Sequence, residues 1–300
     1  MVPDGRRWAA DARPAAAEPF RRRSGRGGDA AGMANSPVGA LSARQLLNKV
    51  PEVTLFFWVI KVLATTVGET FADFLSGLGL GLGGTTVVMT AVFVVVLVVQ
   101  FRTRRYVPAI YWLTVVLISV VGTLLTDNLT DVLGVPLELS TAVFAIALGI
   151  TFAVWYSTER TLSIHSVVTL RREAFYWLAV LLTFALGTAV GDLVDEKFGV
   201  GYWPTALLVA LIIGAIAVSH LVFRADAVLT FWLAYILTRP LGASLGDGLA
   251  QPKADGGLAL GTTWTSLLFL ATILAVVTYL AVTKRDQAAV PEAEAAAIAR

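Results

Sequence analysis

The sequence predicts an all-α membrane protein with eight transmembrane helices, arranged as four parallel two-helix repeats. First, 57% of the 300 residues are hydrophobic and only 15% are charged, whereas soluble domains are about half apolar and about a quarter charged. Second, the apolar residues lie in long, nearly uncharged blocks, and about 18 or more such residues can span a bilayer. Third, a pattern of Trp, Gly and Asp recurs four times along the chain.

The apolar blocks define the predicted spans in chain order. They cover residues 53–76, 85–101, 108–133, 138–156, 174–198, 203–223, 229–249 and 260–282.

The charges of the connecting segments predict the orientation of these spans. Arg-rich connectors alternate with connectors that carry only Lys197 and Lys253 as basic residues. Because Lys and Arg are enriched in cytoplasmic loops, both termini are predicted to be cytoplasmic. Aromatic pairs such as Tyr111–Trp112 and Tyr176–Trp177 lie beside the Arg-rich connectors. They indicate an aromatic belt at the same membrane interface.

Two polar tails flank the predicted membrane domain, which covers residues 47–285. Residues 1–46 are rich in Arg, Ala, Gly and Pro, a composition that predicts a disordered basic tail on the cytoplasmic side. Residues 286–300, rich in Ala and Glu, are predicted to form a C-terminal tail. Met33 is an alternative start of translation, which would make the preceding residues a translated leader.

Each odd-numbered span carries the same three residues at the same spacing. An aromatic residue precedes a Trp, a Gly follows ten residues later, and an Asp follows five residues after the Gly. The four sets are Trp58–Gly68–Asp73, Trp112–Gly122–Asp127, Trp177–Gly187–Asp192 and Trp232–Gly242–Asp247. Repetition at fixed spacing indicates a repeated structural unit.

The repeated unit is predicted to be a helical hairpin, made of one marked helix, an outer turn and one plain apolar helix. The hairpins cover about 53–101, 108–156, 174–223 and 229–282. Since each hairpin enters and leaves on the cytoplasmic side, an axis along the membrane normal relates the repeats. At about 1.5 Å per residue, each Gly lies near the middle of the bilayer, and each Asp lies about 22 Å above its Trp. The spacing therefore predicts four carboxylates that point at a shared axis.

Charged residues inside the spans predict a polar site on this axis. An ionised residue at the bilayer centre costs about 2.5–3.5 kcal/mol, so these groups must face one another, a water-filled cavity or a bound cation. The predicted cation- and proton-binding residues, which are also the candidate metal ligands, are Glu69, Asp73, Asp127, Asp192 and Asp247. The residues predicted to support them are Lys61, Thr66, Gly68, Gly122, Thr123, Asn128, Gly187, Thr188, Arg239 and Gly242.

A structural interpretation of the same charges stays open. The aspartates would then lie among lipid headgroups at the outer helix ends, and the glycines would only allow close helix packing. In this interpretation Lys61 and Glu69, eight residues apart on one helix face, form a structural ion pair.

Other features argue against an enzyme. The chain has no cysteine, which excludes disulfides and cysteine nucleophiles. Its two histidines and three methionines disfavour a zinc or soft-metal site. The sequence Gly79-x-Gly81-x-x-Gly84 matches a dinucleotide-binding motif, but that motif requires a preceding strand, and here it joins two apolar helices. We expect no enzymatic activity and no cofactor.

Two sequence features carry a resemblance to a known family. The opening segment contains Lys49-Val-Pro-Glu-Val-Thr54 and Thr65-Thr-Val-Gly-Glu-Thr70, and Tyr-Trp, Gly-Thr and Asp recur in the units that follow. Over about residues 48–282 the chain resembles the bacterial family called "uncharacterised membrane-anchored protein". The resemblance implies a multi-pass protein of the bacterial cytoplasmic membrane that exports a cation. The fourth unit departs from the pattern with Arg239, Pro240 and Ala243, so equal roles for the four units are not implied.

The expected function is that of a secondary transporter. We expect it to export a hard metal cation in exchange for protons, because oxygen ligands favour alkali metals, Mg²⁺, Ca²⁺ or Mn²⁺. Its expected partners are the transported cation, protons and the lipid bilayer, and no nucleic acid. The alternatives are a channel or carrier for an organic cation, and a non-transporting scaffold or accessory subunit.

Overall fold

The computed structural model describes residues 48–287, so the predicted N-terminal tail and most of the C-terminal tail lie outside the described residues. In this range the chain is helical and contains no strand. The long helices are α3 (Leu55–Leu75), α4 (Gly81–Arg102), α5 (Pro108–Asp127), α6 (Leu137–Glu159), α7 (Leu170–Asp192), α8 (Tyr202–Leu221), α9 (Ala227–Ala250) and α10 (Thr262–Thr283). The short helical turns are η1 (Ser76–Leu80), η2 (Asn128–Val132), η3 (Ile164–Ser166), η4 (Leu193–Lys197) and η5 (Lys253–Asp255).

Seven helical segments of the described chain are long and apolar enough to cross a membrane. The first of them, Leu55–Arg102, has 48 residues, more than twice the roughly 20 that a bilayer requires. It contains α3 and α4, which are joined through η1, where Gly79 has a φ of 104°. Glycine adopts a positive φ without steric cost, and this conformation interrupts the helix. The chain is therefore a multi-pass membrane protein.

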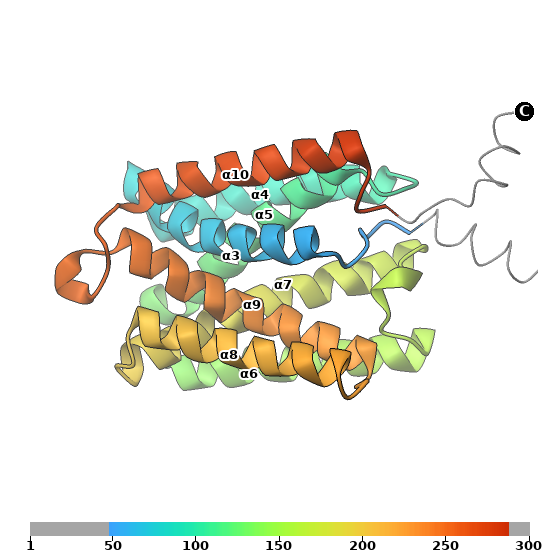
Figure 1. Cartoon of the computed structure of the whole chain (residues 1–300). Coiled ribbons are helices and arrows are strands. Elements are labelled where there is room, and N and C mark those ends of the chain that lie inside the picture. Colours follow the sequence, from blue (N-terminus) through green and yellow to red (C-terminus); the bar gives the residue numbers. More distant parts are fainter. Residues whose placement is uncertain (1–47, 288–300) are drawn as a thin grey trace, which may run out of the picture. The chain divides into compact units, whose positions relative to one another are not determined.

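The four helices that carry the repeated Trp, Gly and Asp form an inner ring. Figure 1 shows α3, α7 and α9 between α10 at the top and α8 and α6 at the bottom. In this ring α3 packs against α5 and α9, and α7 packs against the same two helices. The remaining long helices α4, α6, α8 and α10 lie outside the ring and leave most of their residues exposed to the surroundings. Their mostly apolar surfaces suit contact with lipid.

Each outer helix packs mainly on the inner helix of the next repeat, and not on the inner helix of its own. Thus α4 packs on α5, α6 on α7, and α8 on α9. The last outer helix, α10, packs on the first inner helix, α3, and so links the fourth repeat to the first. The hairpin predicted from the sequence is therefore a covalent unit whose two helices are not each other's principal neighbours.

The aromatic pairs repeat one contact four times around the ring. The aromatic residue that precedes each Trp packs against the Trp of the next repeat, with ring centroids 5.5 to 6.2 Å apart. Trp112, Trp177 and Trp232 are only 2 to 4% exposed. For these three residues the predicted interfacial aromatic belt is wrong, because they fill the spaces between helices.

The repeated glycines make a second fourfold contact deeper in the ring. A Cβ on each would overlap the residue that stands seven positions after the Trp of the following repeat. The contacts are Gly68 with Ser119, Gly122 with Phe184, Gly187 with Arg239, and Gly242 with Thr65. Since equivalent positions meet at two depths, the four inner helices run in the same direction, and the repeats are parallel.

Replacing Gly242 with alanine should destabilise the protein by about 1–3 kcal/mol, because the new methyl group would push α9 away from α3. Thermal unfolding of the purified protein in detergent measures this effect. Gly214→Ala is the matched control, since no other part of the structure lies within 4 Å of a Cβ there and alanine is the better helix former. Equal loss of stability in both variants would contradict the close approach at Gly242.

A buried polar cluster closes one end of the ring, the end that carries the Arg-rich connectors and is called the basic end below. Residues 48–54, which precede α3, cross this end and are called the N-terminal strap. The Lys49 Nζ donates to Glu173 Oε2 at 2.6 Å and to the Phe101 carbonyl oxygen at 3.1 Å. Gln100 Nε2 donates to the other Glu173 oxygen at 3.1 Å. These bonds tie the strap to the ends of α4 and α7.

The segment that follows α10 takes part in the same closure. The Tyr106 hydroxyl donates to Asp286 Oδ2 at 2.5 Å, and the Glu52 amide donates to the Asp286 carbonyl oxygen at 2.9 Å. Burial and the neighbouring Asp286 carboxylate raise the pKa of the Tyr106 hydroxyl well above its usual range. Asp286 is buried, although it is the first residue of the predicted C-terminal tail.

Candidate functional site

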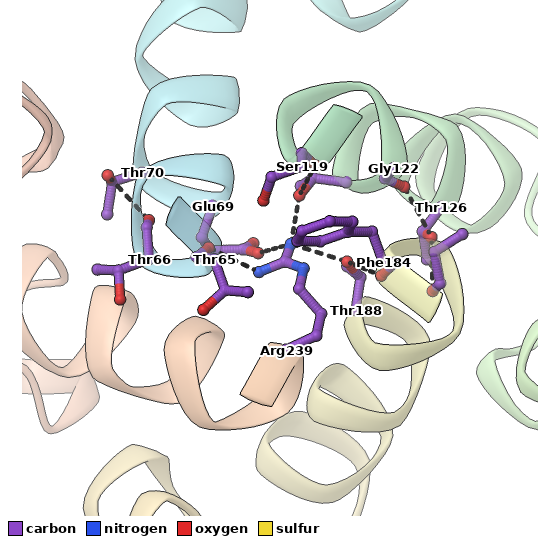
Figure 2. Close-up of polar contacts among 12 residues, drawn as sticks. Thr65, Thr66, Glu69, Thr70, Ser119, Gly122, Thr126, Phe184, Thr188 and Arg239 are labelled. Carbon is purple, nitrogen blue, oxygen red and sulfur yellow. Dashed lines mark hydrogen bonds and ion pairs between the residues drawn. The ribbon is translucent and has the colours of Figure 1, made fainter. Parts of the chain in front are cut away.

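The centre of the inner ring is occupied by Arg239, whose side chain is fully buried. Arg239 lies on α9, seven residues after the repeated Trp, where the other repeats carry Thr, Ser and Phe. Its Nη1 donates to the Thr65 carbonyl oxygen at 3.0 Å. Its Nη2 donates to Glu69 Oε2 at 2.6 Å, to Thr188 Oγ1 at 2.8 Å and to Thr123 Oγ1 (Figure 2). The guanidinium thus connects α9 with all three other inner helices.

The partners of Arg239 show how the repeat builds this site. Glu69, Thr123 and Thr188 each lie eleven residues after their Trp, on α3, α5 and α7, and the equivalent residue of α9 is Ala243. Three inner helices therefore direct an oxygen atom to the same point, and the fourth supplies the cation. We call the Thr65 carbonyl, the Glu69 carboxylate and the two threonine hydroxyls the oxygen cradle.

Arg239 reaches this position because a glycine lies beside its stem. A Cβ on Gly187 would overlap the Arg239 side chain and come within 3.1 Å of Pro240. Gly187 was predicted to support the site, and it does so by leaving room for the arginine. The planar guanidinium presents several donors in a fixed geometry, which suits contact with acceptors on several helices.

The four repeated aspartates lie one further helical turn along the ring, at the end opposite the basic end. Each is partly exposed. Asp127 lies within electrostatic range of Glu69 and Asp73, and Asp247 lies within range of Glu69, Asp73 and Asp192. Glu69 and the four repeated aspartates, which come from the four inner helices, are called the carboxylate group below.

Lys61 lies on the other side of Arg239, towards the basic end. Its side chain is buried, and Nζ lies 3.9 Å from the ring centroid of Phe184 and 4.3 Å from that of Tyr235. Within residues 48–287, Nζ has no hydrogen-bond partner. The Lys61–Glu69 ion pair considered above is not formed, because Glu69 binds Arg239 of the neighbouring helix α9.

Other predicted supporting residues have local structural contacts. The Thr66 hydroxyl donates to the Val62 carbonyl of its own helix. Asn128 Nδ2 donates to Thr86 Oγ1 at 2.7 Å and thereby links the end of α5 to α4. Neither residue has a hydrogen bond to the Arg239 guanidinium among those described.

Sequence reasoning missed two contributors. Thr65 takes part through its backbone carbonyl, which no side-chain pattern can reveal. Asp195 is buried in η4 and accepts a hydrogen bond from Ser244 Oγ at 2.7 Å. Its position three residues after Asp192 places both on one helical face, which is the signal that could have identified it.

In the part of the chain that the structure describes, no group of three or more acidic or histidine side chains is arranged to hold a metal ion. The role of the five carboxylates as metal ligands stays a prediction.

The four segments 56–106, 110–161, 175–226 and 230–286 each match the family described as Repeat of Unknown Function (DUF347). The chain belongs to the DUF347 repeat family. The four DUF347 matches coincide with the four repeats predicted from the sequence, and each covers one inner helix and the outer helix that follows it. No curated protein and no solved structure matches the chain.

Proposed function

We propose that this protein is a secondary transporter that exchanges a cation for protons through the carboxylate group of its inner ring. One observation carries the proposal. The buried Arg239 binds one acid, Glu69, and each of the four inner helices carries its repeated aspartate one helical turn further along, at one end of the ring. Negative charge is costly in a membrane domain, and either a cation or protons can neutralise it. If a cation and protons compete for the same carboxylate oxygens, transport of the cation is coupled to transport of protons.

The proposed topology has eight spans. Helices α3 and α4 have 21 and 22 residues, so each is long enough to cross the hydrocarbon core separately. Because Lys and Arg are enriched in cytoplasmic loops, the Arg-rich connectors favour a cytoplasmic basic end, with both termini on that side. The carboxylate group then faces the outer half of the membrane, and the resemblance implies that this is the bacterial cytoplasmic membrane.

The cation itself is proposed from the ligands. Oxygen ligands suit a hard metal ion, which is the cation predicted from the sequence. The oxygen cradle, however, already holds a guanidinium through a carboxylate, a carbonyl and two hydroxyls. This observation favours the alternative substrate class, an organic cation.

The carboxylate group can be tested by replacing Asp127 with asparagine. In proteoliposomes with a pH-sensitive dye inside, we expect wild-type protein to show cation-dependent proton flux and Asp127→Asn to lose at least about 90% of it. The reason is that an amide cannot exchange a proton for a cation. The cations to be compared are sodium, potassium, magnesium, manganese, guanidinium and methylammonium.

Asp226→Asn is the matched control for this experiment. Asp226 caps α9 at the basic end, where its carboxylate accepts a hydrogen bond from the Leu229 amide at 2.8 Å, and asparagine caps a helix equally well. This variant should retain wild-type flux. Undiminished flux in Asp127→Asn would contradict the proposed site, and absence of flux with every cation would favour the scaffold interpretation.

A further inference from the structure

Arg239 fills a site that is built from oxygen acceptors on the other inner helices. We propose that the oxygen cradle is a binding site for a free monovalent cation, and that Arg239 occupies it as a tethered cation when that ligand is absent. The inference rests on the proposed function and deepens it, because it names the substrate class and the atoms that bind it.

The symmetry of the repeat supports a site that exists independently of the arginine. Three different repeats place a polar side chain at the same position, eleven residues after the Trp, and these side chains meet on the axis. Arg239 itself comes from a different position of the fourth repeat, where the others carry Thr65, Ser119 and Phe184. The cradle thus belongs to the repeated pattern, whereas the guanidinium is an exception to it.

The charge of the cradle selects the class of ligand. Among the groups that bond to the guanidinium, Glu69 supplies the single negative charge, and the other three acceptors are neutral oxygens. A monovalent cation matches this single charge, as the Arg239 guanidinium does. The existing contacts are N–H donors to oxygen, so a guanidinium or small ammonium ion reproduces them most closely.

The way in which the Arg239 side chain is attached to α9 allows it to leave the oxygen cradle. The next residue, Pro240, lies inside α9 and has no N–H for the helical ladder, so the helix can bend at this point. Arg239 Nε has no hydrogen-bond partner among residues 48–287, so withdrawal of the side chain breaks only the bonds made by the two terminal nitrogens. Gly187, beside the arginine stem, adds no side chain that would block this movement.

The surroundings indicate the direction of entry. On the basic side, Lys61 and the rings of Phe184 and Tyr235 fill the axis next to the cradle. On the other side lies the partly exposed carboxylate group, whose negative charge attracts cations. A free cation therefore reaches the cradle through the carboxylate group.

Chemical rescue tests this inference without a transport assay. Arg239→Ala removes the tethered cation, and its melting temperature in detergent should be lower than that of the wild type. Guanidinium chloride at millimolar concentrations should then raise the melting temperature saturably, by about 3 °C or more. Methylammonium should give a smaller rise, and sodium, potassium and magnesium chlorides at equal ionic strength should give none. The wild type, in which Arg239 competes for the cradle, should respond only at higher guanidinium concentrations than Arg239→Ala.

The double variant Glu69→Gln/Arg239→Ala is the control, because it lacks the charge of the cradle and should not respond to guanidinium. If Arg239→Ala cannot be purified, Arg239→Gln replaces it, expressed with and without guanidinium in the growth medium. Accumulation of folded protein only with guanidinium would support the inference. No response of either variant to any cation, or a response to magnesium alone, would overturn it. Asp127-dependent flux in wild-type protein would then still stand, so failure of the cradle and failure of the transport proposal are distinguishable.

Discussion

Replacing Glu69 with glutamine should destabilise the protein by about 3–5 kcal/mol, the cost of removing one partner from a buried ion pair. Glu69 Oε2 lies 2.6 Å from Arg239 Nη2, and the arginine side chain is fully buried. Glutamine has nearly the same shape and keeps an acceptor oxygen, so the loss measures the missing negative charge. We also expect cation-dependent proton flux to disappear, since Glu69 belongs to both the cradle and the carboxylate group.

Thermal and denaturant unfolding of the purified variant measure the first effect, and the proteoliposome assay measures the second. Glu138→Gln is a matched control, because Glu138 also pairs with a cation, Lys197, but at an exposed position. Exposed ion pairs contribute little to stability, so this variant should unfold like the wild type. If Glu69→Gln were as stable as Glu138→Gln, the Glu69 carboxylate would not be the group that balances the charge of Arg239.

Replacing Glu173 with alanine should have an effect of similar size at the basic end. The substitution removes the carboxylate from Lys49, whose side chain is 10% exposed, and we expect a loss of about 3–5 kcal/mol. The N-terminal strap should detach more often, because Lys49 then keeps only the Phe101 carbonyl among its hydrogen-bond acceptors.

Detachment can be measured with a thiol reagent, because the chain has no cysteine of its own. Val50 lies in the strap and is 4% exposed, so Val50→Cys should react slowly in the wild-type background and much faster together with Glu173→Ala. The double variant Lys49→Met/Glu173→Leu is the control, since replacing both partners of a buried pair by apolar residues is often neutral. It should recover part of the stability, since Gln100 still loses its Glu173 acceptor, and equal labelling in all backgrounds would show that the ion pair does not hold the strap.

Much of the membrane domain could be predicted from residue spacing alone. The interval from Trp to Gly to Asp identified the four repeats and the helices that form the inner ring. The spacing of residues in the sequence shows the order of the helices along the chain, however, whereas the neighbours of a helix in space depend on how the helix surfaces fit together. The placement of α4 on α5 therefore could not be read from the repeat, nor could the burial of the Trp112 side chain, since an aromatic residue near a basic loop also fits a lipid interface.

The sequence identified which residues form the candidate site, but not which of them bind one another. The five acids and two bases were identified as a set, because charge is rare in apolar spans. Helical periodicity favoured the local pair of Lys61 and Glu69, yet Glu69 binds Arg239, which is 170 residues away in the sequence. This contact depends on the packing of α9 on α3, which closes the ring and which periodicity within one helix does not reveal. The role of the Thr65 carbonyl also could not be predicted, because every residue has a backbone carbonyl and the sequence does not distinguish one from another.

The packing of α10 on α3 has a consequence for biosynthesis. The first inner helix leaves the ribosome early, but its outer neighbour is the last long helix of the described chain to be made. Until then one side of the nascent bundle stays open to lipid, and no single repeat can complete its own contacts. A chain that stops before α10 would therefore leave the outer face of α3 without its packing partner. Assembly is completed only when α10 packs on α3.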